Sequence, residues 1–218
     1  NDLPIAAMAA RLRADGYELA PLLRTLFKSE AFFSARSKAG LVKGPIEHVV
    51  GFLRATSLAP IDAPQAGDAV GTPSNTLRTL DTWVTTLAQR PTQPPSVNGW
   101  PVTEQWLSAQ NMLDRANTVV QCIRDRTDQG NAGVDVTTLL PPPGQRSAPE
   151  VVDALATLLR VTLSASERTQ CETYLSSQAG AGGVPTPSPF DASNATHVSE
   201  RVRGLLYILA QHPTYAVR

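Results

Sequence analysis

The sequence predicts an all-α protein, an irregular bundle of about eight helices joined by long loops rich in proline and glycine. Apolar residues recur at intervals of three and four in most of the segments between those loops. No segment shows the sustained alternation of polar and apolar residues that is typical of a strand. Hydrophobic residues make up 42% of the 218 residues, which is sufficient to build a core.

Three helices are predicted in the first 55 residues. Residues 5–12 have helical apolar spacing, and Asp15-Gly16 ends that helix. A second helix runs over about 18–29, and Gly44-Pro45 opens a third, because proline is tolerated at the first helical position. The apolar stripe of the second helix consists of Leu19, Leu22, Leu23, Leu26 and Phe27.

Two further helices follow a loop rich in proline and glycine at 59–74. The fourth covers about 75–89. The fifth is the longest, over about 103–127, with Thr103 as its expected N-cap. The side chains expected on its inner side are Trp106, Leu107, Met112 or Leu113, Ala116-Asn117, Val120 and Ile123.

The segment 128–146 ends in three prolines and a glycine, so we interpret it as a linker between two helical subdomains. These subdomains are 1–127 and 147–218, with the second packed on the first. Capping boxes at Ser147–Glu150 and Ser164–Glu167 begin two helices of the second subdomain. After a loop at 180–189, a last helix over about 194–212 ends at Pro213.

Composition excludes several classes of function. The net charge is +0 and the pI is near 7.0, which argues against a general nucleic-acid binder and a polybasic membrane-surface protein. No apolar run is long enough to span a bilayer, and no signal peptide is visible. Because the chain does not begin with Met, we expect a processed product or a fragment.

Cys122 and Cys171 both fall in predicted helices. They are either two half-buried thiols or a single disulfide that joins two helices in an oxidising compartment. Two cysteines and three histidines make a structural zinc site improbable, and we expect no cofactor.

Three segments resemble a known bacterial family. They are 26–54, which includes Val42-Lys43-Gly44-Pro45-Ile46-Glu47-His48; 95–117, which includes Asn98-Gly99-Trp100-Pro101; and 205–218, which includes His212-Pro213-Thr214-Tyr215. Together they resemble the C-terminal half of the bacterial domain-of-unknown-function family numbered 1800. The resemblance implies an exported, periplasmic or extracellular protein, whose partner is the missing N-terminal half or another envelope protein. It transfers no catalytic residue.

Five residues are candidates for a binding site: Trp100, Trp106, Asn111, His48 and Glu47. The two tryptophans are either a stacking platform or packing residues, and we favour packing. Glu47 and His48 are neighbours on a helix and point in different directions, which argues against an acid–base pair. Asn111, with Asp114, Arg115 and Asn117, either lines a pocket or belongs to a buried hydrogen-bond network, and we favour the network.

The sequence contains no Gly-x-Ser-x-Gly elbow, phosphate-binding loop or His-Glu-x-x-His motif. It therefore does not establish whether the protein is an enzyme. The first hypothesis is a structural or interaction module of a larger exported protein or assembly. The alternative is part of an enzyme with a pocket near Trp100, Trp106 and Asn111.

Overall fold

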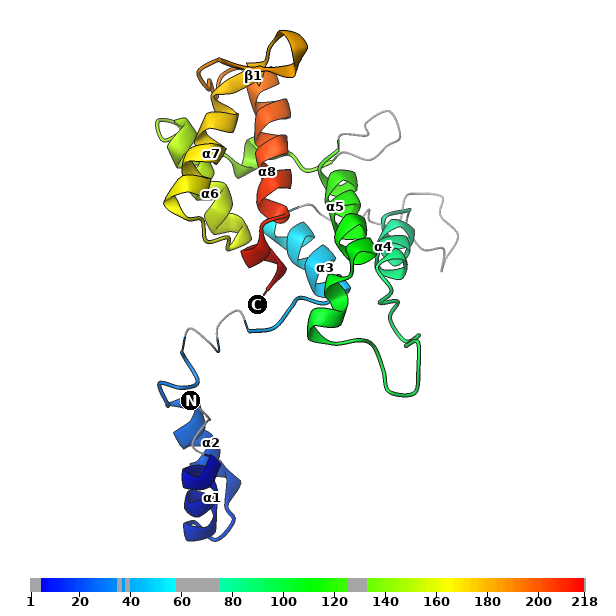
Figure 1. Cartoon of the computed structure of the whole chain (residues 1–218), viewed down its shortest axis with the longest axis vertical. Helices are drawn as coiled ribbons and strands as arrows, with labels where there is room; N and C mark the ends of the chain where they lie inside the picture. The colour runs from blue at the N-terminus through cyan, green and yellow to red at the C-terminus, as the bar shows by residue number, and fades with distance from the viewer. Residues whose placement is uncertain (1–4, 35–36, 38–39, 58–74, 125–132, 218) are drawn as a thin grey trace, which may run out of the picture. The chain divides into compact units, whose positions relative to one another are not determined.

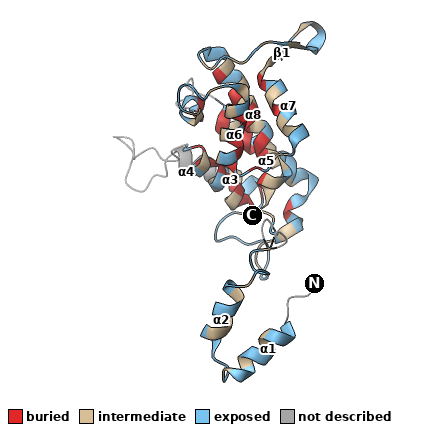
Figure 2. Cartoon of the chain, turned by 90° about the vertical axis from the view of Figure 1, so that its left-hand side faces the viewer, coloured by how far each residue is buried: buried red, intermediate tan, exposed pale blue. Residues whose placement is uncertain are grey.

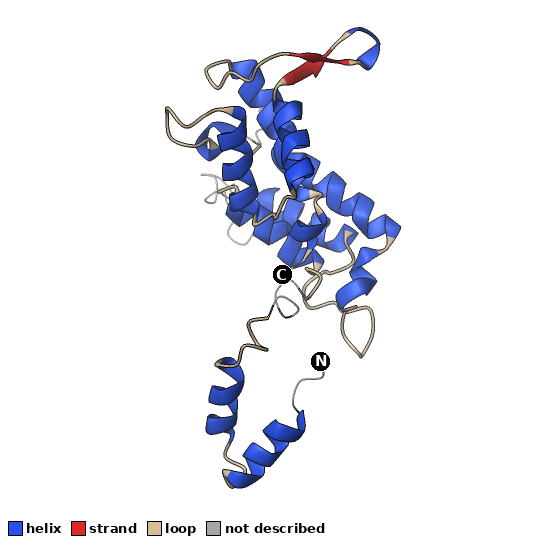
Figure 3. Cartoon of the chain, turned by 60° about the vertical axis from the view of Figure 1, so that its left-hand side comes forward, coloured by secondary structure: helices blue, strands red, loops and turns tan. Residues whose placement is uncertain are grey.

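A computed structural model describes residues 5–34, 37, 40–57, 75–124 and 133–217. It confirms the mainly helical fold: within those ranges there are eight α-helices, and the only sheet has two strands (Figures 1 and 3). The chain divides into two compact units, of which the first ends at Leu41 and the second comprises Val42–Val217. The expected linker at 128–146 overlaps residues 125–132, which lie outside the described residues.

The first unit contains two helices that pack on each other, α1 (Ile5–Ala14) and α2 (Leu19–Phe27). The chain reverses at Gly16 and Tyr17, both of which have positive φ angles, 63° and 66°. No described residue of this unit is buried, and Figure 2 shows both helices as exposed or intermediate.

The second unit is organised around α8 (Arg203–Ala210), which packs on one side against α5 (Ala109–Ile123) and on the other against α6 (Ala148–Leu159) and α7 (Ala165–Leu175) (Figure 1). The helix α3 (Pro45–Ala55) packs against α4 (Asn75–Thr86), α5 and α6. Helices from both sides of the expected linker therefore share one core. Its fully buried leucines include Leu155, Leu175, Leu205, Leu206 and Leu209.

The capping boxes at Ser147 and Ser164 form as their sequences predict. The Glu150 carboxylate accepts from the Ser147 N–H at 2.8 Å, and the Glu167 carboxylate accepts from the Ser164 N–H at 2.7 Å. Because each glutamate satisfies a backbone donor that the helix leaves free, these two starts are determined locally.

The fifth predicted helix differs from expectation. Residues Thr103–Leu107 form a short 3-10 helix, η1, in which Thr103 has a φ of 53°. The α-helix starts after Ser108, whose hydroxyl accepts from the Asn111 N–H at 3.2 Å. Its buried face is Arg115, Thr118, Val119, Cys122 and Ile123, whereas Leu107, Met112 and Leu113 are exposed. The expected inner face was therefore wrong at Leu107 and for both alternatives, Met112 and Leu113, and also at Asn117, which is exposed.

A small hairpin occupies the loop predicted after α7. Strand β1 (Ser177–Ala179) pairs antiparallel with β2 (Pro185–Pro187). The Arg201 side chain anchors it by donating to the Leu175 and Ser188 carbonyls at 2.8 and 2.7 Å. Arg201 lies in a π-helical turn, His197–Val202, which directly precedes α8. Two more 3-10 helices cover Val136–Leu139 and Pro213–Ala216 (η6), and a 3-10 turn covers Ala181–Gly183.

Candidate functional site

The C-terminal segment lies beside the stretch that leads into α3. Val42 and Val217 form an isolated antiparallel bridge, and the Lys43 N–H donates to the Ala216 carbonyl at 2.8 Å. The Lys43 ammonium group donates to the Tyr215 carbonyl at 2.6 Å. These contacts join residues more than 170 positions apart in the chain. The secondary-structure propensity of either segment cannot predict such contacts.

Tyr215, at the centre of this junction, is almost completely buried. Its hydroxyl donates to the His48 carbonyl at 3.2 Å, and its ring lies 5.3 Å from the His48 ring in an edge-on arrangement. The Lys43 ammonium group lies 3.8 Å from the ring centroid, a cation–π contact. Burial raises the pKa of the Tyr215 hydroxyl, so it stays protonated at neutral pH.

Glu47 has a structural role at the start of α3. Its carboxylate accepts from the Gly44 N–H at 3.0 Å, as in the two other capping boxes. The next free donor, the Ile46 N–H, is satisfied by the Gln89 side-chain oxygen at 2.9 Å. That oxygen lies 3.0 Å from where a Cβ on Gly44 would stand, so the absence of a side chain at Gly44 allows this close approach.

Arg115 connects α5 to the same junction. Its side chain is only 1% exposed, and one terminal nitrogen, Nη2, donates to the Lys43 carbonyl at 2.7 Å. The Nε and Nη1 atoms are buried and have no hydrogen-bond partner. None of the ion pairs in the described part of the chain includes Arg115. Burial accordingly lowers the pKa of this guanidinium.

His48 is 2% exposed, and neither of its ring nitrogens has a hydrogen-bond partner. Burial, followed by the positive charges of Arg115 and Lys43, lowers its pKa to about 3. The ring is therefore neutral at physiological pH. Without solvent access and with so low a pKa, it is poorly suited to act as a general acid or base.

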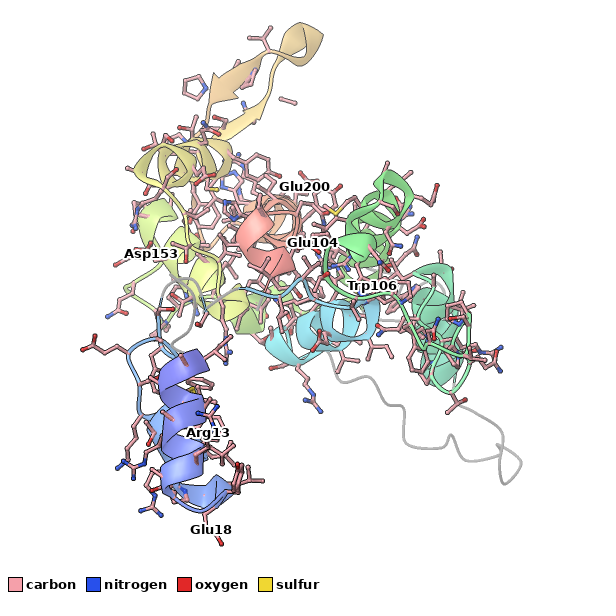
Figure 4. The ribbon with its side chains drawn as sticks, turned by 60° about the horizontal axis from the view of Figure 1, so that its bottom comes forward. Arg13, Glu18, Glu104, Trp106, Asp153 and Glu200 are labelled. Carbon is pink, nitrogen blue, oxygen red and sulfur yellow. The ribbon has the colours of Figure 1, made fainter. Side chains whose placement is uncertain are left out.

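The two candidate tryptophans have different environments. Trp106, on η1, is 3% exposed and lies within the second unit, where Figure 4 labels it with Glu104. Trp100 is half-buried and follows a turn in which the Gly99 N–H donates to the Ser96 carbonyl at 3.1 Å. Gly99 has a φ of 90°, so this turn requires glycine. The indole nitrogen of Trp100 is buried and has no partner.

Asn111 is half-buried in the first turn of α5, and its Oδ1 is buried without a partner. Arg115 lies four residues later, so both side chains belong to one face of the helix. The structure therefore brings His48 and Arg115 together and places Asn111 one turn away. Asp114 instead pairs with the Gln110 amide at 2.9 and 3.0 Å, and Asn117 is exposed.

No local sequence pattern identifies Lys43 and Tyr215 as partners. Both lie in segments that carry the family resemblance, and Arg115 lies in the third. The only available signal was that these three segments carry the family resemblance together, since segments that share such a pattern often contact one another in the fold.

Cys122 and Cys171 are both free and buried, on α5 and α7. Burial raises the pKa of the Cys122 thiol to about 12, and it also raises that of Cys171, with Glu167 and Glu172 contributing. Neither thiol is suited to nucleophilic chemistry, which requires an accessible thiolate. The described residues contain no group of three or more His, Cys, Asp or Glu side chains that could hold a metal ion.

A hollow of about 310 Å³ lies between α6 and the start of α7. Its charged side chains, Asp153 and Arg168, already pair with each other, and Arg168 also donates to Glu172 at 2.9 Å. The hollow contains none of the five predicted site residues, and no sequence motif marks it.

A family model described as a protein of unknown function (DUF1800) matches residues 3–217. The chain belongs to the DUF1800 family. No curated protein and no solved structure matches it. In this DUF1800 chain, Lys43, Arg115 and Tyr215 come from three distant segments and meet at one junction, in which Arg115 and Tyr215 are buried. Among the described helices, none is long and apolar enough to cross a membrane.

Proposed function

We propose that this DUF1800 chain is a structural and interaction module of an exported bacterial protein or assembly. One observation supports the proposal above others: the titratable groups near the candidate site are engaged inside the fold or buried within it. Glu47 caps α3, Arg115 binds the Lys43 carbonyl, and His48 is buried and neutral. A catalytic site instead needs polar groups that a substrate can reach.

Tryptophan fluorescence tests whether the candidate site is filled by the protein's own side chains or open to solvent. A variant with Trp83 and Trp100 replaced by phenylalanine retains only Trp106, which is 3% exposed. We expect blue-shifted emission and weak quenching by acrylamide or iodide. The matched variant that retains only Trp100 should be quenched more strongly, because that residue is half-buried. Strong quenching of Trp106 would contradict a filled site.

The interaction role is supported by the first unit, whose apolar side chains are exposed along α2 and in the segment after it. Exposed apolar surface of this kind usually marks an interaction site. The proposal requires a protein surface to cover these side chains in the cell, from the same polypeptide, a second copy or another envelope protein.

Oxidative footprinting in intact cells tests this role. Phe27, Phe32 and Phe33 should be less modified in cells than in the dilute purified protein, while exposed Leu113 on α5 serves as the reference. Equal modification in both settings would argue against an interaction role.

Export is part of the proposal and rests on the family resemblance. We expect the protein in the periplasmic or secreted fraction of the bacterium that produces it. Recovery with cytoplasmic markers alone would contradict this part and leave the interaction role in place.

A second candidate function, part of an enzyme with a pocket at Trp100, Trp106 and Asn111, is favoured by two unpaired atoms. The Trp100 indole nitrogen is a buried donor and the Asn111 Oδ1 a buried acceptor, and neither has a partner. A polar ligand could satisfy both. The tryptophan emission of the unmodified protein should then change on binding a sugar, amino acid or nucleotide, and Asn111→Ala should abolish the change. No response across such a panel would contradict this candidate.

A further inference from the structure

A carboxylate, an imidazole and a hydroxyl form a chain of hydrogen bonds outside the candidate site, where η6 meets the start of α7. The His212 Nε2 atom lies 3.1 Å from the Glu167 Oε1 atom. On the other side of the ring, the His212 Nδ1 atom lies 2.7 Å from the Thr214 Oγ1 atom. These groups stand in the order of orienting acid, base and nucleophile, at the distances that nucleophilic catalysis requires.

The backbone at Thr214 selects the tautomer of the imidazole. The Thr214 N–H donates to His212 Nδ1 at 3.2 Å. Because an N–H can only donate, Nδ1 carries no proton in this contact, so the proton of the neutral ring is on Nε2 and is donated to Glu167. Nδ1 is then free to take the proton of the Thr214 hydroxyl, which lies closer to it than the N–H does. This tautomer is the form that acts as a general base.

Both carboxylate oxygens of Glu167 are engaged. Oε2 accepts from the Ser164 N–H at 2.7 Å and from the Ser164 hydroxyl at 2.6 Å, which is the capping box of α7. Oε1 faces His212. These bonds, those of Ser164 first, lower the pKa of Glu167 to about 2, so the carboxylate is charged at neutral pH. Glu150 makes the same two capping contacts with Ser147 at the start of α6.

Capping explains only part of this arrangement. His212 is the N-cap of η6, and that role needs only the Thr214 N–H contact. The α7 capping box likewise needs only one oxygen of Glu167. The hydroxyl contact of Nδ1 and the Oε1 contact of Nε2 lie outside both roles.

The three groups are accessible, unlike the buried imidazole of His48. The side chains of His212 and Glu167 are 14% and 43% exposed, and Thr214 is half-buried. His48 is 2% exposed, and neither of its ring nitrogens has a partner. His212 therefore meets two requirements of a general base that His48 fails, access and a hydrogen-bonded partner.

The hollow between α6 and the start of α7 lies beside the hydroxyl. Thr162 lines this hollow of about 310 Å³, and its N–H donates to Thr214 Oγ1 at 3.1 Å. The hydroxyl is thus one hydrogen bond from a residue of the wall. The volume is at the small end of the range for small-molecule sites. Asp153, which Figure 4 labels on α6, pairs with Arg168 on the wall. The apolar side chains of the wall are Ala156, Val161 and Leu163.

We propose that Glu167, His212 and Thr214 form a hydrolytic site for small esters, with the acyl group in the hollow. In the first step, Thr214 Oγ1 bonds to the carbonyl carbon of the ester and gives its proton to His212 Nδ1. The carbonyl oxygen becomes negatively charged, and the Thr162 N–H, 3.1 Å from Oγ1, is placed to donate to it. The bond from carbon to the alcohol oxygen then breaks, and the alcohol leaves with the proton from Nδ1.

Water completes the reaction. It attacks the carbonyl carbon of the acyl-threonine and gives a proton to His212 Nδ1; the bond to Thr214 Oγ1 breaks, and Oγ1 takes this proton back. The net reaction converts an ester and water into an acid and an alcohol. His212 and Thr214 are catalytic residues in this scheme, and Glu167 is a positioning residue. The activity goes beyond the proposed structural and interaction role and does not depend on it.

Labelling with a fluorophosphonate tests the nucleophile. A bond forms between Thr214 Oγ1 and phosphorus as the phosphorus–fluorine bond breaks, with fluoride as the leaving group and the hydroxyl proton passing to His212. We expect one adduct per chain, located on Thr214 by peptide mass spectrometry. Thr214→Ser should still be labelled and Thr214→Val should not, with circular dichroism as the check on folding. A label on another residue, or none on the unmodified protein in large excess of probe, would overturn the proposal.

Hydrolysis of p-nitrophenyl butyrate tests the base and the residue that positions it. His212→Gln should lower kcat by about 100-fold or more. Glu167→Gln keeps a side chain that can cap α7, and it should lower kcat by about tenfold or more with little change in KM. The matched control Glu150→Gln makes the same change in the capping box of α6 and should leave both constants unchanged. Equal effects of the two glutamate variants, or full activity of His212→Gln, would show that these contacts only cap helices and would overturn the site.

Discussion

Arg115 is the residue whose environment most needs an explanation. A buried guanidinium with one hydrogen bond and two unpaired nitrogens is costly, because removing a cation from water is repaid only by well-placed partners. Its contribution here is geometric: it ties α5 to the residue that precedes α3.

We expect Arg115→Met to stabilise the protein by about 1 kcal/mol, since the relief of a desolvated charge exceeds the loss of one hydrogen bond to a carbonyl. Urea unfolding at pH 7 measures the change. A loss of about 3 kcal/mol or more would instead show that Arg115 has a strong partner within the fold.

His48 makes stability depend on pH. Its pKa is about 3 in the folded protein and about 6.5 when exposed, so between these values the unfolded state binds a proton that the folded state does not. Above pH 6.5, the contribution of His48 to the free energy of unfolding should not change with pH. It should then fall by about 1 kcal/mol per pH unit as the pH decreases toward 3.

The comparison with His48→Gln isolates this effect, because all other groups titrate in both proteins. The free energy of unfolding of the unmodified protein, minus that of His48→Gln, should be lower at pH 4.5 than at pH 7. Parallel pH profiles would show that burial and the positive charges of Arg115 and Lys43 do not hold His48 neutral.

At the scale of the elements, α7 and α8 meet at a glycine. A Cβ on Gly204 would lie 1.8 Å from the Tyr174 hydroxyl oxygen and 2.8 Å from Cζ, so the tyrosine ring occupies the space that any side chain would need. Glycine in a helix interior costs about 1 kcal/mol relative to alanine, and this contact explains why it is retained.

Gly204→Ala should therefore destabilise the protein by about 1–3 kcal/mol through overpacking. In the Tyr174→Ala background the same change should stabilise by about 1 kcal/mol, because the clash is gone and the helix preference remains. Thermal unfolding of the four proteins in this cycle measures the sign. A destabilising effect in both backgrounds would mean that Tyr174 is not the obstacle.

Helix starts were more predictable than helix faces. The capping boxes of α6 and α7 require only residues three positions apart, so their sequence is sufficient. The buried face of α5 was misjudged because Met112 and Leu113 are apolar yet exposed, while Arg115 faces inward. A periodicity argument assigns apolar residues to the core, and it has no means of anticipating a buried cation held by a distant carbonyl.

At the scale of the whole molecule, the second unit is expected to unfold as one. Helix α8 packs against α5 as well as against α6 and α7, so residues from both predicted subdomains lie in the same core. All three tryptophans lie between residues 83 and 106, outside the segment that contains α8.

Leu205→Ala, at a fully buried position on α8, should cost about 2–5 kcal/mol and shift the tryptophan fluorescence transition by the same amount as the circular dichroism transition. The exposed Ile208→Ala on the same helix is the control and should change stability little. A fluorescence transition that stays in place would show that 1–127 and 147–218 unfold independently.

The sequence by itself determined the helical class, the positions of most helices, the capped starts of α6 and α7, and the family, because these depend on periodicity and on contacts within one turn. Only the tertiary structure decided that Lys43, Arg115 and Tyr215 meet, that His48 is buried, and that the compact units divide after Leu41. The junction depends on contacts between residues about 70 to 170 positions apart. No local pattern encodes which distant carbonyl a buried side chain will reach.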